Sequence, residues 1–165
     1  MTGMNQVRGA VIRCLQDSGL EAVPRMGQQR EKRPGGAVAA VGVRQSSGRA
    51  MGFCSYLGQV YDEEKGTVRE LYGKRLEVDL AVDIYAPESD ECEAAAETAA
   101  EVLLSGLPSG LKPLEASWGE VKWDRDRDLY VRQGAVRCTA YFTATGSEES
   151  GALLDFELKG VVLPC

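Results

Sequence analysis

Two aspartates, Asp79 and Asp83, stand inside an apolar run from Leu76 to Ile84, and a cluster of acids follows Pro87. Two carboxylates close together could hold a metal ion or share a proton. On a strand that rises ~3.3 Å per residue, however, their Cα atoms would be roughly 13 Å apart. We therefore interpret the pair as part of a strand face turned toward water or a neighbouring subunit.

A second candidate site is the pattern Asp155-Phe-Glu157-Leu-Lys159. In metal-dependent nucleases, carboxylates hold Mg²⁺ and a lysine assists the attacking water. The same three residues are also the outward positions of an alternating strand whose inward positions are apolar. The partner acid that a nuclease site needs upstream has no defined place in the sequence. A nuclease-like enzyme is therefore a remote alternative.

Three further acids, Asp124, Asp126 and Asp128, have the spacing that begins a calcium loop. Such a loop needs glycine at its sixth position and glutamate at its twelfth. The sequence has Leu129 and Ala135 there, and arginines stand between the acids. We predict a solvated turn whose charges compensate one another.

The chain has 165 residues, no histidine and five cysteines. Without histidine, a Ser-His-Asp or Cys-His site cannot form within one chain. The number of cysteines is odd and no C-x-x-C pair occurs, while Cys14, Cys92 and Cys138 fall on apolar stripes. We interpret these three as small core residues in a reducing cytoplasm. Neither phosphate-binding glycine motif is present. We expect no cofactor and no metal ion.

The net charge of −6 argues against binding duplex DNA through the outer surface, which needs clusters of Lys and Arg. The beginning of the chain lacks the pattern of a signal peptide. No apolar stretch approaches the ~20 residues of a membrane span. These features lead us to expect a cytosolic protein that folds as a single domain over residues 1–165.

Apolar periodicity predicts two helices. The first covers residues 5–18 and stops at Gly19. The second follows Pro87, is capped by Ser89 or Asp90, carries a capping box between Asp90 and Glu93, and ends near residues 105–106. Acids in the first turn of the second helix favour its start through the helix macrodipole.

Alternating patterns predict seven strands, at residues 20–24, 37–45, 53–61, 75–86, 115–123, 131–145 and 153–163. Between them we expect loops at 26–36, 46–52 and 107–113, and turns at 62–66, 124–128 and 146–151. Because most of the connections are short, the pairing should be mainly antiparallel. The fold class we predict is α+β, a mainly antiparallel sheet with two helices packed on one face.

The strand at residues 75–86 has the clearest alternation. Its predicted core side consists of Leu76, Val78, Leu80, Val82 and Ile84. Its predicted outer side consists of Glu77, Asp79, Ala81, Asp83 and Tyr85.

The middle of the chain, ELYGKRLEVDLAVDIYAPESDECEAAAETAAEVLLSGL, resembles the small tail-terminator (tail-completion) proteins of tailed bacteriophages and prophages. The shared features are an E-x-Y-G turn at residues 70–73, an alternating strand that ends in D-I-Y-A-P at 83–87, and an acidic start to an amphipathic helix. The wider layout is also similar and includes an aromatic and acidic turn at residues 118–128. The resemblance covers most of the chain, and residues 70–104 are its distinctive part.

The resemblance implies a structural protein without enzyme activity. Its subunits would form a ring, usually a hexamer, that caps the finished tail tube and docks to the head connector. The expected partners are other copies of the chain, the tail tube protein and a neck protein, with DNA only as passing cargo and no membrane. The chain would assemble in the host cytoplasm and reside in the virion tail or neck. A neck or head–tail connector protein of similar build is the nearest alternative.

A head-to-tail ring needs two different, complementary patches on each subunit. An acidic channel would also repel the DNA backbone and keep it from adhering. Candidate interface residues come from a basic loop, an acidic turn and the outer side of the strand at 75–86: Arg30, Lys32 and Arg33; Asp62, Glu63 and Glu64; and Asp79, Asp83 and Tyr85. The alternative for each loop is a solvated surface without a partner.

Overall fold

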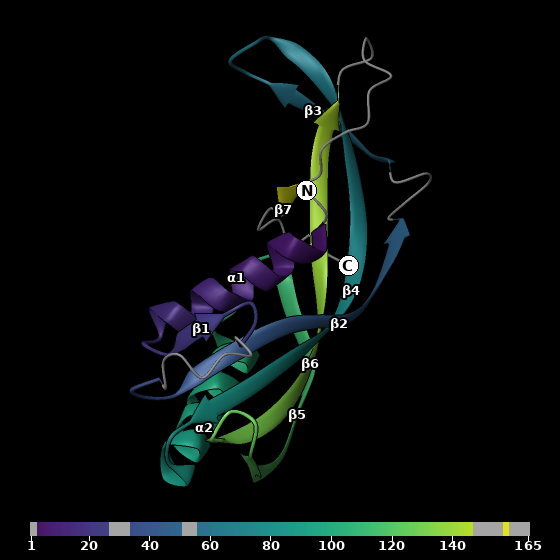
Figure 1. Ribbon diagram of the computed structural model, residues 1–165. Coiled ribbons are helices and arrows are strands. Elements are labelled where there is room, and N and C mark those ends of the chain that lie inside the picture. The colour runs from purple at the N-terminus through teal and green to yellow at the C-terminus, as the bar shows by residue number, and fades with distance from the viewer. Residues whose placement is uncertain (1–2, 27–33, 51–55, 147–156, 159–165) are drawn as a thin grey trace.

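The computed structural model describes residues 3–26, 34–50, 56–146 and 157–158 (Figure 1). Its elements, in chain order, are α1 (Gly3–Asp17), β1 (Glu21–Val23), β2 (Val38–Ala50), β3 (Tyr56–Asp62), β4 (Thr67–Ala86), α2 (Ser89–Ser105), β5 (Leu111–Asp124), β6 (Leu129–Gly146) and β7 (Glu157–Leu158).

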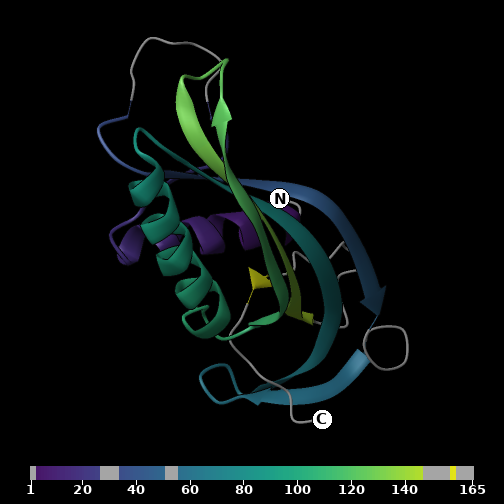
Figure 2. The ribbon, with the colours of Figure 1, turned by 90° about the horizontal axis from the view of Figure 1, so that it is seen from below.

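The described strands form one sheet in the order β1-β2-β4-β6-β5, with β3 paired to β4 and β7 paired to β6. Every pairing is antiparallel except that of β1 with β2, which is parallel. Both helices lie on the same side of the sheet, and the sheet bends toward that side (Figure 2). The predicted α+β class is thereby confirmed.

The core lies between the helices and the sheet, and β4 supplies its centre. The predicted alternation holds, because Val78, Leu80, Val82 and Ile84 are fully buried on the helix side. The facing positions of β6 and the apolar stripes of both helices complete the core: Val136, Cys138, Ala140 and Phe142; Val7, Ala10, Val11 and Leu15; Cys92, Ala95, Ala96, Ala99 and Leu103. The alanines of α2 let the helix backbone approach the sheet closely.

Two of the three cysteines expected in the core are buried there. Burial raises the pKa of Cys138 to about 11, so this thiol stays protonated at neutral pH. Cys92 is also buried, and its Sγ donates to the Ile84 carbonyl. Cys14 is only partly buried, at the edge of the α1 stripe.

Helix α1 ends as the sequence predicts. Gly19 adopts a φ of 89°, and the Leu20 amide donates to the Leu15 carbonyl, which closes the last turn. The start of α2 differs from the prediction. Glu88 occupies the N-cap position in extended conformation and makes no side-chain capping bond, so the predicted cap at Ser89 or Asp90 is wrong. The acids of the first turn remain, as the helix macrodipole favours.

Strand β4 is longer than predicted and changes the interpretation of its neighbours. The predicted loop at 46–52 is wrong up to Ala50, because residues 46–50 continue β2 and pair with residues 74–78 of β4. The E-x-Y-G segment at 70–73 is not a turn but part of β4, paired with β3 and β6. In both cases a long partner strand satisfies backbone groups that local sequence signals assign to a loop.

Close packing explains the glycine of that segment. A Cβ on Gly73 would lie 2.5 Å from Leu57 Cδ1, so a larger residue would force the Leu57 side chain to move. Tyr72 donates a hydrogen bond to Glu70 and packs edge-on against Tyr56, with ring centroids 5.7 Å apart. The segment is therefore a closely packed part of β4, at the place where the body of the sheet continues into the β3–β4 hairpin.

Other boundaries moved by a few residues. Strand β5 begins at Leu111, inside the predicted loop at 107–113, and β6 covers the predicted strand at 131–145. Of the predicted strand at 153–163 only residues 157–158 lie within the described part, as β7. None of the helices in the described ranges has the length and apolar character needed to cross a membrane.

Candidate functional site

The face of the sheet opposite the helices, which we call the outer face, carries the charged side chains of the central strands. The register between strands sets four small residues side by side across it: Gly42 on β2, Ala81 on β4, Ala135 on β6 and Ser117 on β5. This row is flanked by larger polar groups on both sides. We call the resulting depression the outer trough; the row is its floor.

On one side of the floor, Asp79 is paired with Arg137. The Arg137 Nε donates to Asp79 Oδ1 at 2.8 Å, and this bond raises the pKa of the guanidinium. Glu115 lies opposite Arg137 on β5, and Arg44 stands at a bulge in β2. Together with Gln45 these side chains border a hollow of about 350 Å³.

On the other side of the floor, Asp83 is half-buried. Burial raises the pKa of this carboxyl, while the charges of Arg44 and Arg127 and the Gly134 backbone oppose the shift. Its Oδ1 is inaccessible to solvent and has no hydrogen-bond partner among the described residues. A buried acceptor without a partner carries a desolvation cost, so Asp83 is a place where an added donor would stabilise the protein.

Next to Asp83, the outer face has a small core of its own. Tyr85 is only 8% exposed and packs with Leu129 and Val131. The Arg127 guanidinium lies over the Tyr85 ring, 5.3 Å from its centroid. Burial raises the pKa of Tyr85, and the nearby Arg127 opposes this. Little of Tyr85 is therefore left for a partner to touch.

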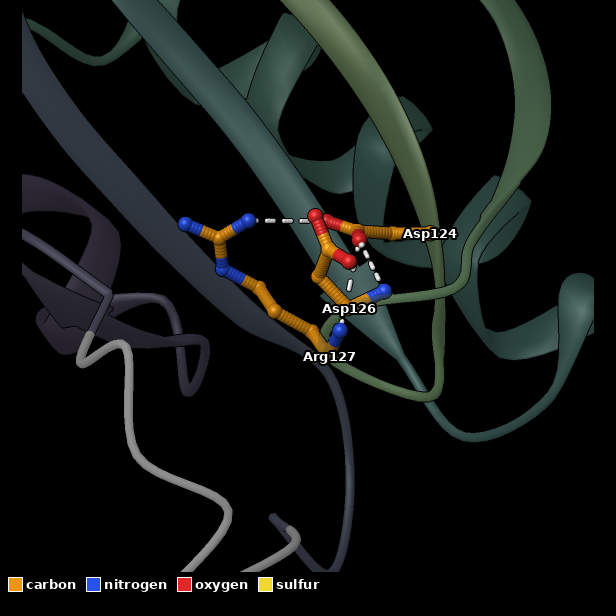
Figure 3. Close-up of polar contacts among 3 residues, drawn as sticks. All are labelled: Asp124, Asp126 and Arg127. Atoms are coloured by element: carbon orange, nitrogen blue, oxygen red, sulfur yellow. Dashed lines mark hydrogen bonds and ion pairs between the residues drawn. The ribbon is translucent and has the colours of Figure 1, made fainter.

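The β5–β6 turn holds Arg127 in place (Figure 3). Asp124 Oδ1 accepts hydrogen bonds from the amides of Asp126 and Arg127, and Asp124 Oδ2 accepts from Arg127 Nη1 at 2.9 Å. Burial alone would raise the pKa of Asp124, but the hydrogen bonds and charge of Arg127 outweigh it and lower the pKa. The segment is a self-compensating turn, as the sequence predicts.

Arg127, Asp83 and Tyr85 border a second hollow of about 200 Å³, which Arg25 and Met26 also line. Like Asp83 Oδ1, Arg127 Nε is buried without a hydrogen-bond partner among the described residues. Both atoms lie beneath the surface of this hollow, so neither is open to solvent. Each hollow takes two residues of the floor, Ser117 and Ala135 in the first and Gly42 and Ala81 in the second.

The acidic turn at residues 62–66 lies at the tip of the β3–β4 hairpin. Asp62 is engaged within the chain, because its Oδ1 accepts from two backbone amides of the turn and its Oδ2 pairs with Arg69 at 3.0 Å. Glu63 and Glu64 are exposed. Gly66 has a φ of 62°, as the predicted turn requires. Of the three predicted acids, only Glu63 and Glu64 are available to a partner.

The hairpin also exposes an unusual amount of apolar surface. Tyr61 is 62% exposed at its tip. Three more large apolar side chains of β3 and β4 are exposed along its length: Tyr56, Val60 and Val68. Exposed apolar residues that gather on a projecting element mark an interaction surface more often than isolated ones do.

The remaining predicted residues divide between the trough and the parts of the chain that are not described. Arg30, Lys32 and Arg33 lie outside the described residues, as do Asp155 and Lys159 of the nuclease-like pattern; Glu157 lies in β7. Asp79 and Asp83 line different hollows and do not form a joint site. Within the described ranges, no three acidic or cysteine side chains are grouped closely enough to hold a metal ion.

Sequence reasoning missed the arginines that complete the outer face. Arg137 and Glu115 could have been placed there, because each alternates with core residues along its own strand. Arg44 sits at a bulge, where simple alternation fails. Arg127 comes from a turn, so no periodicity places it. The sequence alone does not show which of these side chains meet.

The chain was also compared with known proteins. No protein-family model matches it, and no curated protein matches it.

Proposed function

We propose that this protein is a structural subunit of a bacteriophage or prophage tail, a terminator that assembles into a ring on the finished tail tube and docks to the head connector. The observation that carries the proposal is the β3–β4 hairpin. It extends β4 beyond the helix-covered part of the sheet (Figure 1) and leaves four large apolar side chains 37% to 62% exposed. Such a projecting surface fits a subunit that acts by contacting other subunits.

Two further features support this function. The D-I-Y-A-P segment on which the resemblance depends forms the junction between the end of β4 and the start of α2. The junction is buried, since Ile84, Tyr85 and Ala86 all lie in cores. The net charge of −6 suits a ring through which DNA passes, because an acidic wall repels the phosphate backbone.

The experiment that tests the function is binding of the purified chain to purified phage tail tubes, imaged by negative-stain electron microscopy. We expect ring-shaped density at one end of the tube and a halt in further tube growth. Light scattering of the free chain should give a mass several times 17.8 kDa, unless the ring forms only on the tube. A chain that stays monomeric and binds no tube would overturn the proposal.

The nearest alternative, a neck or head–tail connector protein, makes the opposite binding prediction. Such a protein binds the portal complex in the absence of tails. Parallel pull-downs on tail tubes and on portal complexes therefore decide between the two. Retention on the portal complex alone would replace the terminator assignment with the connector assignment.

A further inference from the structure

We propose that the β3–β4 hairpin of one subunit docks into the outer trough of a second copy of this chain. This contact is the subunit interface of the proposed ring and rests on that function for its biological meaning. It joins two different surfaces of the molecule, a projecting hairpin and a receiving trough. Interfaces of this head-to-tail kind generate rings when the rotation between subunits closes.

The geometry makes the contact intermolecular. The hairpin bends toward the helix side of the sheet (Figure 2). The trough lies on the outer face, because its floor residue Ala81 stands between the core residues Leu80 and Val82 of β4. Thr67, next to the tip, and Asp83, in the trough, are separated by ~50 Å of extended β4 strand. A hairpin on the opposite side and at the far end of the strand cannot fill the trough of its own chain.

The trough has open space over its floor, and the tip carries a large side chain that could occupy it. The floor of the trough consists of residues with small side chains or none, and a Cβ built on Gly42 meets no atom within 4 Å. The hairpin tip presents Tyr61, a large aromatic side chain that is mostly exposed. Aromatic side chains that fill a shallow pocket are frequent energetic centres of interfaces.

The charges are complementary as well. The two hollows are bordered by four arginines and three carboxylates, a local charge of +1 on a chain whose net charge is −6. Arg25 and Arg44 are exposed and form no ion pair within the described residues. The tip offers Glu63 and Glu64, which are exposed and likewise have no ion pair there.

The first test removes each side of the contact and measures self-association by sedimentation equilibrium and light scattering. Glu63→Lys with Glu64→Lys reverses the charge of the tip, and Gly42→Leu fills the floor of the trough. Gly42 has no left-handed φ and has open space around it, so the leucine is compatible with the fold. We expect each variant to weaken self-association, or assembly on tail tubes, at least tenfold.

Matched controls separate the contact from general effects. Glu97→Lys with Glu101→Lys makes the same charge change on exposed positions of α2, and Gly9→Leu places the same side chain in open space on α1. Both should assemble like the unaltered chain. Combining the tip reversal with Arg25→Glu and Arg44→Glu should restore assembly in part. No loss from either tip or trough variant would contradict the contact.

A photo-crosslink keeps the test decisive. A benzoylphenylalanine in place of Tyr61 is irradiated with the free chain and with the chain on tail tubes, and the crosslinked peptides are identified by mass spectrometry. Crosslinks to residues 40–45 or 81–85 of another copy support the proposal. If rings form but residue 61 crosslinks to other parts of the neighbouring copy, the docking of the hairpin into the trough is overturned and the ring is not. Absence of any self-association, free or on tubes, overturns the ring as well.

Discussion

The two faces of the sheet are made by the same strands and yet do different work. On the helix side, alternate residues of β4 meet α1 and α2 and disappear from solvent. On the outer face, the residues between them carry ion pairs, two hollows and a small-residue floor. One face stabilises the fold, and the other is free to be shaped for a partner. Substitutions on the two faces should therefore have very different consequences.

The largest effect is expected where a core side chain is removed. Leu80 is fully buried on the helix side of β4, so Leu80→Ala leaves a cavity and should lower the free energy of unfolding by about 2–5 kcal/mol. Leu114 of β5 is 57% exposed, and Leu114→Ala should change it by less than roughly 0.5 kcal/mol. Urea denaturation followed by circular dichroism measures both. Equal losses would contradict the difference in burial between the two leucines.

Two glycines should differ next most strongly. A Cβ on Gly134 would lie 2.3 Å from the Trp118 ring and 2.7 Å from the Val82 carbonyl oxygen. Gly134→Ala should therefore cost roughly 1–3 kcal/mol through overpacking. Gly42→Ala, on the open floor of the trough, should be neutral within roughly 0.5 kcal/mol. If Gly134→Ala melts at the same temperature as the unaltered chain, the close packing at Trp118 is refuted.

The outer face should also show itself in the pH dependence of stability. The pKa of Asp83 is higher in the folded protein than its ordinary value of 3.8, so the folded state binds this proton more tightly than the unfolded state. As the pH rises from near 3.8 through the folded pKa, ionisation of Asp83 lowers the free energy of unfolding. The stability of Asp83→Asn relative to the unaltered chain should therefore increase over that interval. Thermal melts between pH 3 and pH 7 measure the difference.

The pKa of Asp124 is shifted in the opposite direction, so this residue serves as the control. Its pKa is lowered by Arg127, so its contribution to stability is present above its ordinary pKa and is lost as the pH falls through the lowered one. Asp124→Asn should therefore be less stable than the unaltered chain at pH 7, and this deficit should shrink in acid. A gain by Asp124→Asn at neutral pH would contradict the turn as described.

The smallest effect is expected from the exposed ion pair between Asp79 and Arg137. Double-mutant cycles on solvent-exposed pairs give a coupling of about 0.2–1 kcal/mol, and added salt screens it. The cycle Asp79→Ala with Arg137→Ala should fall in that range at low salt and approach zero near 1 M NaCl. A larger coupling that salt does not reduce would mean that this part of the trough is more buried than its exposure indicates.

Local pattern was enough for much of the fold. The stripes of both helices, the alternation of β4 and β6, and the turns at Gly19, Gly66 and residues 124–128 all follow from residue types at short spacing. These features depend on interactions between residues close in sequence, or on which side of an element is apolar. Such information is present in a short window of the chain.

The errors occurred where a distant segment decided the outcome. Residues 46–50 and 70–73 carry the glycines and polar residues of loops, yet both form strand. Residues 46–50 pair with β4, and residues 70–73, which belong to β4, pair with β3 and β6. The parallel pairing of β1 with β2 likewise joins segments that are about 17 residues apart in the sequence, Glu21 with Val38 for example. Helix α2 begins after Glu88, two residues beyond the end of β4, without the side-chain cap that its first residues suggest.

The sequence by itself determined that Asp79, Asp83 and Tyr85 share the side of β4 that faces away from the helices, because a strand alternates its side chains with a period of two. Only the tertiary structure decided what they meet there. Pairing of β4 with β2 and β6 set Arg137 beside Asp79, and the β5–β6 turn brought Arg127 over Tyr85. Asp83 Oδ1 is buried there without a hydrogen-bond partner among the described residues. No local pattern predicts this, because solvent exposure depends on strands and turns far apart in the chain.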